Sequence, residues 1–162
     1  MREELRKRCD LFIENRDIIK STFGWESPYV YPMCAGILTS RGSLAEADRL
    51  LNCRDILKAN TGPFSNFRGV SKLAVITMLS LTANPEMVME QMLTIYGRLK
   101  EYFWGSEYLT VAAATVAEMA DPSRYEEIIR KTGSIYSRMK STHPFLTSGE
   151  DSAFAALLAM SE

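Results

Sequence analysis

The sequence has few of the residues from which most metal and redox sites are built. Its 162 residues include one histidine and three cysteines, and no two cysteines have the C-x-x-C spacing. Metal sites need several such ligands close together, so we expect no metal and no cofactor. Because Cys9, Cys34 and Cys53 are odd in number and lie in or beside apolar helical patterns, we expect reduced thiols and a cytoplasmic protein.

Long apolar runs and an excess of one charge are also missing. The longest charge-free stretches, such as 27–40, are shorter than the roughly 20 residues of a membrane-spanning helix. The first residues, Met1 to Lys7, do not resemble a signal peptide. Nineteen basic and twenty acidic residues leave a formal charge of -1, which gives no overall field to attract a polyanion. We therefore expect neither a membrane nor a nucleic acid as a partner.

The chain does have a regular alternation of two kinds of helical pattern. Amphipathic segments, with apolar residues every three or four positions, alternate with segments that carry almost no charge. Caps and stops bound them, including Ser27-Pro28, a capping box at Ser43 and Glu46, Asn84-Pro85 and Asp121-Pro122. The expected helices are 2–22, 28–40, 43–60, 70–82, 85–103, 108–120, 122–140 and 152–160.

Aromatic turns follow the amphipathic segments at nearly constant spacing. From Trp25 to Phe64, from Phe64 to Trp104 and from Trp104 to Phe145 the steps are 39, 40 and 41 residues. A period in that range is typical of stacked helical hairpins. We predict an all-α fold of four antiparallel helical hairpins, or eight helices, in a curved α–α superhelix, which closure would make part of an α/α toroid. The single domain would hold repeats at about 1–41, 42–83, 84–120 and 121–162.

The apolar inner helices have a consequence for partners. A helix that is apolar all round must be covered on every side, whereas an open array leaves one face of its inner layer wet. The cover could be closure of the array, a second copy in a homodimer, or further C-terminal repeats. The last helix ends at Met160-Ser161-Glu162 without the polar outer face of a terminal cap. This pattern favours a second copy or a chain that is a fragment of a longer protein.

If outer helices run one way and inner helices the other, all four aromatic turns lie on one edge. The N-termini of the inner helices point to that edge, and their free N–H groups favour an anion or carboxylate. Aromatic rings, mixed charge and free donors suit a binding site for a peptide, a protein or a small polar ligand. The candidate ligand-binding residues are Trp25, Glu26, Phe67, Arg68, Trp104, Glu107, Tyr108, His143 and Asp151.

The same residues can have purely structural roles. The aromatics can staple their hairpins, and Ser27, Ser106 and Ser148 can be N-caps. Arg68 and Lys72 can form ion pairs with Glu26 or Glu107. We interpret Trp104 as a packing residue and Glu107 as the residue that packing does not explain.

An enzyme is the alternative function. Glu107 and Glu150 are candidates for an acid and base pair, which would require their carboxyl groups to converge within about 5 to 10 Å. A triad of His143, Ser148 and Asp151 is not expected, because residues so close in sequence rarely reach triad geometry.

The turns carry a family resemblance. The chain resembles a bacterial family of helical proteins of unknown function, domain of unknown function 4003. The matching stretches are Phe12-Ile13-Glu14-Asn15-Arg16, Phe64-Ser65-Asn66-Phe67-Arg68-Gly69, Phe103 to Leu109, and His143-Pro144-Phe145-Leu146-Thr147-Ser148 with Glu150-Asp151 and Phe154-Ala155-Ala156-Leu157-Leu158. The resemblance implies that this chain is the N-terminal half of a longer protein, and it brings no reaction. More loosely, Gly62 to Thr82 is similar to repeats of the toroidal fold of prenyltransferases, cyclases and some carbohydrate enzymes, which implies a carbohydrate- or lipid-directed reaction.

Overall fold

The computed structural model describes residues 2–161, and it confirms the all-α fold with eight α-helices in that range. Two short 3₁₀ helices join them, and these residues contain no strand. The elements are α1 (Arg2–Thr22), α2 (Val30–Ser40), α3 (Ala47–Asn60), η1 (Asn66–Arg68), α4 (Lys72–Ser80), α5 (Pro85–Leu99), α6 (Glu107–Met119), η2 (Pro122–Arg124), α7 (Tyr125–Thr142) and α8 (Asp151–Ser161).

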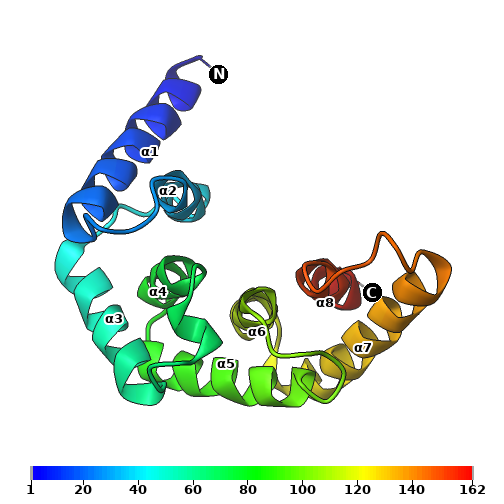
Figure 1. The fold of residues 1–162 in the computed structure, drawn as a ribbon. Coiled ribbons are helices and arrows are strands. Elements are labelled where there is room, and N and C mark those ends of the chain that lie inside the picture. Colours follow the sequence, from blue (N-terminus) through cyan, green and yellow to red (C-terminus); the bar gives the residue numbers. More distant parts are fainter. Residues whose placement is uncertain (1, 162) are drawn as a thin grey trace.

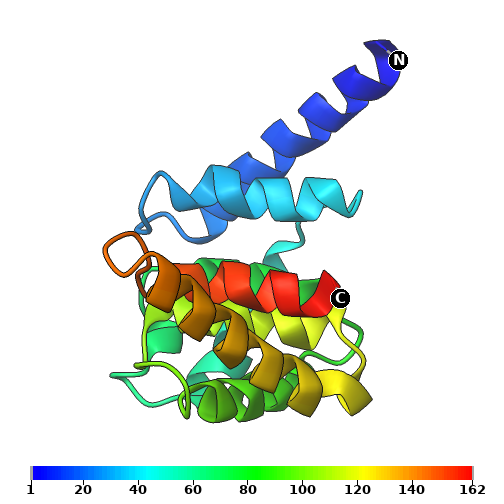
Figure 2. The ribbon, with the colours of Figure 1, turned by 90° about the vertical axis from the view of Figure 1, so that its right-hand side faces the viewer.

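The helices form two layers that follow an arc. Each odd-numbered helix packs against the even-numbered helix that follows it, and each layer also packs within itself, α1 on α3 on α5 on α7 and α2 on α4 on α6 on α8. Figure 1 shows the inner helices α2, α4, α6 and α8 nearly end-on along the concave side of this arc. Figure 2 shows the four turns that lead from outer to inner helices at one edge, on the left of the view.

The core lies between the two layers, and α4 is its most buried helix. All seven residues from Leu73 to Leu79 are buried. The outer helix α5 presents Val88, Met92, Ile95 and Leu99 to this core, at steps of three and four residues. Full burial of such a side chain stabilises the fold by about 1.5–3 kcal/mol, so the apolar stripe of each outer helix holds it to the inner layer.

The helix starts at Asn84 and Ser106 follow directly from the sequence. The side chain of Asn84 accepts a hydrogen bond from the backbone N–H of Met87 at 3.1 Å, with Pro85 in the first turn. The hydroxyl of Ser106 accepts one from Leu109 at 3.2 Å. Both are ordinary N-caps, which satisfy N–H groups that lack partners inside the helix.

The expected capping box at Ser43 and Glu46 is wrong, because a distant residue competes for this segment. Asn15, fully buried on α1, donates through Nδ2 to the Ser43 carbonyl at 2.9 Å and accepts through Oδ1 from the Ala45 N–H at 2.7 Å. These bonds hold the segment in irregular backbone, so α3 begins at Ala47 instead.

Two other expected starts are also shifted. Ser27 does not cap α2 with its side chain; its carbonyl accepts from Val30 N–H at 3.0 Å, and the helix begins at Val30. Asp121 does accept from Ser123 N–H at 2.8 Å, but it caps η2, and α7 begins at Tyr125.

The first half of α1 projects from the arc. Residues 2–10 are all exposed, and Figure 2 shows this segment pointing away from the rest of the chain. Ion pairs one turn apart, Lys7 with Glu3 at 3.1 Å and Arg8 with Glu4 at 3.4 Å, run along it. Between residues 2 and 161, none of the helices is both long and apolar enough to cross a bilayer.

Candidate functional site

Four aromatic side chains stand free at the turn edge, which we define as the turns 23–29, 61–71, 100–106 and 143–150. Trp25, Phe64, Trp104 and Phe145 are between 96% and 102% exposed. The interpretation of Trp104 as a packing residue is therefore wrong. These rings are not covered by neighbouring residues, although the first three turns each contain a buried phenylalanine.

Other aromatics do the packing in three of these turns. Phe23, Phe67 and Phe103 are buried. The Phe67 ring meets Tyr96 edge-on, with centroids 5.2 Å apart, and the Phe103 ring lies 4.7 Å from Tyr136. Phe67 was a candidate ligand-binding residue, and the structure places it in the core with 1% of its surface exposed.

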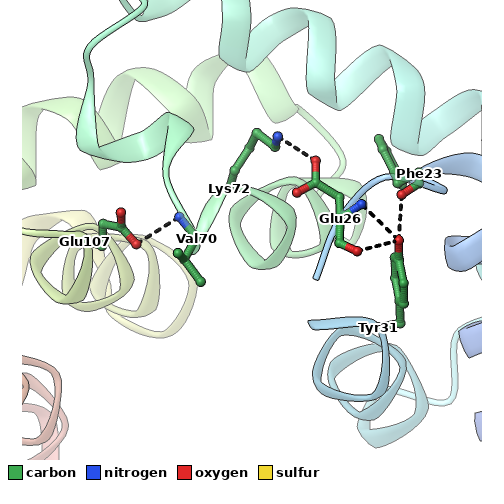
Figure 3. A network of polar contacts seen from close by, with 6 residues as sticks. All are labelled: Phe23, Glu26, Tyr31, Val70, Lys72 and Glu107. Atoms are coloured by element: carbon green, nitrogen blue, oxygen red, sulfur yellow. Dashed lines mark hydrogen bonds and ion pairs between the residues drawn. The ribbon is translucent and has the colours of Figure 1, made fainter. Parts of the chain in front are cut away.

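Polar contacts join each turn to the next. Lys72, at the start of α4, forms an ion pair of 2.5 Å with Glu26 in the first turn. Glu107, at the start of α6, accepts a hydrogen bond of 2.8 Å from the backbone N–H of Val70. Figure 3 shows both contacts, together with the Tyr31 hydroxyl, which donates to the Phe23 carbonyl at 2.7 Å and accepts from Glu26 N–H at 3.0 Å.

Glu107 thus has a structural explanation that the sequence did not reveal. A Cβ atom at Gly69 would come within 2.1 Å of a Glu107 carboxylate oxygen, so glycine at this position leaves room for the carboxylate beside the second turn. The contact fixes the start of α6 against the segment that leads into α4.

The third contact joins the start of α6 to the fourth turn and involves Glu150, one of the two candidate catalytic carboxylates. The Tyr108 hydroxyl donates to Glu150 at 2.9 Å. This hydrogen bond, with the nearby negative charges of Glu150 and Glu107, raises the pKa of the Tyr108 hydroxyl. Glu107 and Glu150 are therefore each engaged with a donor of this chain, and an acid and base role for them stays a prediction from the sequence.

The remaining candidates have local roles. Arg68 donates to the Lys58 carbonyl and to the carbonyl and hydroxyl of Thr61, so it closes the C-terminal end of α3 rather than pairing with a carboxylate. Asp151 accepts from Ser148 N–H at 2.8 Å, which is half of a capping box. His143 ends α7 in an exposed turn.

A groove on the concave face extends well beyond the candidate residues from the sequence, of which only Glu107 and Tyr108 line it. It has a volume of about 970 Å³ and runs along three inner helices. Its lining includes Tyr29, Met33 and Ile37 of the first hairpin, Val70 before α4, Ala74 and Met78 on α4, and Tyr108, Val111 and Thr115 on α6, with Leu157 of α8 beside them. The lining is mainly apolar in the middle and polar at both ends.

The two ends of the groove differ in charge. At the end away from the turns, Arg41 after α2 forms an ion pair of 2.7 Å with Glu118 of α6, which connects the two walls. At the turn edge the lining includes Ser27, Ser106 and Glu107. No cation within residues 2–161 pairs with Glu107, so this end has the uncompensated negative charge.

The cysteines take no part in the groove. Cys34 and Cys53 are buried, Cys9 is exposed, and all three are free thiols. Burial raises the pKa of the Cys34 thiol to about 11 and also raises that of Cys53. In the described range, no three histidine, cysteine or carboxylate side chains gather as metal ligands would.

The signal for the groove was present in the sequence. The inner segments are apolar on the faces that neither the outer layer nor a neighbouring inner helix covers. Met33, Val70, Met119 and Leu157 remain well exposed for this reason. Sequence alone could not show that these faces converge, because their convergence depends on the curvature of the array.

The fold and the groove define a class: two-layered, all-helical arrays with a binding-sized apolar groove on the concave side. The chain belongs to the family described as "Protein of unknown function (DUF4003)", which it matches over residues 15–162. No curated protein and no solved structure matches it.

Proposed function

We propose that this chain is a binding module that holds a helical segment of a partner protein in its concave groove. The observation that carries the proposal is the apolar lining of the groove over the length of α2, α4 and α6. An amphipathic helix laid in a hydrophobic groove is a recurring mode of peptide recognition. The groove ends at the turn edge, so Glu107 and Tyr108 belong to both surfaces.

The shape of the groove favours a helix as its occupant. Lining residues recur along each wall at helical spacing, as in Met33 and Ile37 on α2 or Val111 and Thr115 on α6. The groove therefore runs parallel to the inner helices. Ala74 lies between Val70 and Met78 on the floor, and its small side chain lets a partner backbone approach closely.

Charge favours a basic residue at one end of that helix. Arg41 and Glu118 neutralise each other at the far end. Glu107 remains as a half-buried carboxylate whose bond to Val70 N–H leaves its charge uncompensated. A lysine or arginine of the partner, placed beyond its apolar face, would meet Glu107 and fix the direction of the helix.

A cytoplasmic setting is part of this proposal. The three free thiols are what a reducing compartment allows. A bacterial source follows from the resemblance described above. A second copy of the chain is a competing occupant, since an apolar groove can also be covered in a homodimer.

The test uses two synthetic amphipathic peptides of about 16 residues, between four and five helical turns. Both carry leucines at i, i+4, i+7 and i+11, and they differ only by lysine or glutamine one turn before the first leucine. We expect binding by fluorescence polarisation, with the lysine peptide tighter by several-fold. Glu107→Gln should remove this preference, because the carboxylate is its source.

Two variants distinguish the groove from the rest of the surface. Ala74→Phe fills the floor and should abolish peptide binding, whereas Thr94→Phe adds the same ring to an exposed position on the outer helix α5 and should not. Circular dichroism must show both variants folded. Equal binding by the two variants would contradict the proposal, and a concentration-dependent dimer blocked by Ala74→Phe would assign the groove to a second copy.

A further inference from the structure

The free aromatics of the turn edge need an explanation that packing does not supply. Trp25, Phe64, Trp104 and Phe145 lie one in each turn and are fully exposed. Aromatic side chains of this kind bury about 150–250 Å² each when they find a partner surface. Large exposed apolar side chains gathered on one part of a protein mark an interaction surface.

Three of the turns are packed without the exposed rings. Three of the four turns already contain a buried aromatic, Phe23, Phe67 or Phe103, that packs between the layers. In the fourth turn Leu146 is exposed beside Phe145, which extends the apolar surface. In the first three turns the exposed ring is therefore additional to the aromatic that packs between the layers.

A row of lysines without carboxylate partners accompanies the rings, and two of them, Lys100 and Lys140, lie 5.9 Å from the ring centroids of Tyr96 and Tyr136. Each outer helix ends at this edge with an exposed lysine, and the next free aromatic follows four to six residues later. Among the residues that the structure describes, none of these lysines lies within ion-pair distance of a carboxylate. They are Lys20, Lys58, Lys100 and Lys140.

The acidic residues of the edge are engaged within the chain. Glu26 is neutralised by Lys72. Glu107 accepts a hydrogen bond from Val70 N–H, and Glu150 accepts one from the Tyr108 hydroxyl. Asp151 holds Ser148 N–H. Of these carboxylates only Glu26 is neutralised by a cation, so Glu107, Glu150 and Asp151 keep their charge and stand against the four lysines and Arg68.

The arrangement suits a flat partner. All four turns project at the same edge of the molecule, as Figure 2 shows, so one planar surface can meet them together. Among the described residues, the links at the opposite edge are short and carry no free aromatic ring; the exposed apolar side chains there are Leu44, Met87 and Met119. A single protein or peptide ligand would have to span the whole arc to contact every ring.

The overall charge and the lack of a spanning segment favoured no membrane partner, but they do not bear on a local surface, and we propose that the turn edge docks on an anionic lipid bilayer. The rings of Trp25, Phe64, Trp104 and Phe145 enter the boundary between headgroups and acyl chains, where tryptophan is enriched in membrane proteins. The lysines lie against lipid phosphates, because basic side chains are attracted to an anionic surface. This inference does not depend on the groove, whose occupant comes from the aqueous side.

The two tryptophans of the chain give a direct test, because both lie on this edge. The probe is large unilamellar vesicles of phosphatidylcholine alone or with about 30% phosphatidylglycerol, a content at which basic residues contribute measurably. We expect the tryptophan emission to shift to shorter wavelength on the mixed vesicles, with co-sedimentation of the protein. Vesicles of phosphatidylcholine alone should bind it more weakly, and added salt should reduce the difference.

Variants separate the two contributions. Phe64→Ser with Phe145→Ser retains both tryptophans and should weaken binding to both kinds of vesicle at least about tenfold, from the loss of two buried rings. Lys58→Gln with Lys140→Gln should weaken binding only to the anionic vesicles, by about tenfold or more. Leu5→Ser with Leu44→Ser removes exposed apolar side chains away from the edge and should change nothing.

Either of two results would overturn the proposal. One is the absence of any emission shift or co-sedimentation at millimolar lipid. The other is equal vesicle binding by the wild-type chain and the Phe64→Ser, Phe145→Ser variant, with circular dichroism showing both folded. A surface that serves a protein partner instead would give the first result.

Discussion

At the scale of residues, neighbouring aromatics in one turn have opposite environments. Phe103 is buried against Tyr136, and Trp104, the next residue, is fully exposed. The Phe103 N–H still bonds to the Leu99 carbonyl at 3.1 Å, so Phe103 continues the end of α5 and its ring packs inward, whereas Trp104 lies beyond that last bond. A stability experiment can compare the two directly.

We expect Trp104→Ala to change the free energy of unfolding by less than about 1 kcal/mol, as for most surface substitutions. Phe103→Ala should cost about 3 kcal/mol, since it removes a buried ring and leaves a cavity. Urea unfolding followed by far-ultraviolet circular dichroism measures both without relying on tryptophan. A large loss for Trp104→Ala would show that its ring packs on the chain after all.

Residue roles at the edge were predictable only in part. The sequence indicated that acidic residues and aromatics gather there, and the ion pair of Lys72 with Glu26 was one of its structural alternatives. It could not show that Glu107 accepts from Val70 N–H, because this contact depends on Gly69 and on the packing of the second hairpin against the third. Nor does spacing reveal which aromatic of a turn points inward.

At the scale of elements, local signals predicted the helices and distant contacts moved their ends. Asn84 and Ser106 cap their helices as the sequence indicates, since a cap needs only its own helix. The start of α3 could not be predicted, because Asn15 holds the preceding segment from another helix. Propensity at a helix terminus is worth only about 1 kcal/mol, which such contacts easily exceed.

Arg68 gives a testable case of an element held by one side chain. Its guanidinium donates to the Lys58 and Thr61 carbonyls and to the Thr61 hydroxyl, which closes α3 on the second turn. Arg68→Lys keeps the charge but loses the planar set of donors, so we expect a loss of about 1–2 kcal/mol in thermal or urea unfolding. Arg54→Lys, where the arginine pairs at the surface with Asp55, is the control.

The expected change for that control is within about 0.5 kcal/mol. Similar losses for the two variants would mean that Arg68 contributes charge rather than geometry, and the closing role would then be rejected.

At the scale of the whole molecule, packing is between neighbours along the arc. The main contacts of α8 are with α6 and α7, whereas α4 contacts α2, α3, α5 and α6. In arrays of this kind, stability is close to a sum over units and their interfaces. The ends of the arc should therefore open more easily than its middle.

Hydrogen exchange with mass spectrometry measures this gradient. We expect slowest exchange in α4 and faster exchange in α8. Ala156→Gly, at a buried position of α8, should accelerate exchange in α7 and α8 and leave α2 unchanged, while Ala35→Gly should do the reverse. Equal acceleration over the whole chain in both variants would instead indicate all-or-none opening.

The sequence predicted the two helical layers better than it predicted the groove on the concave face. Alternation of amphipathic and apolar segments is enough to assign helices to an outer and an inner layer. The groove arises from curvature, which depends on side-chain volumes at every interface, such as Ala112 and Ala113 where α6 lies in the inner layer. The four lysines are evident in the sequence, but whether each one meets a carboxylate depends on how the turns pack along the whole edge.

The projecting half of α1 has a practical consequence for handling the molecule. Cys9 lies there in the open, before the first residue of the family match, whereas Cys34 and Cys53 are buried and protonated at neutral pH. A maleimide reagent should therefore attach at one position only. Coupled through that thiol to a sensor chip, the protein would be immobilised in a uniform orientation, with groove and turn edge both presented to the flowing solution.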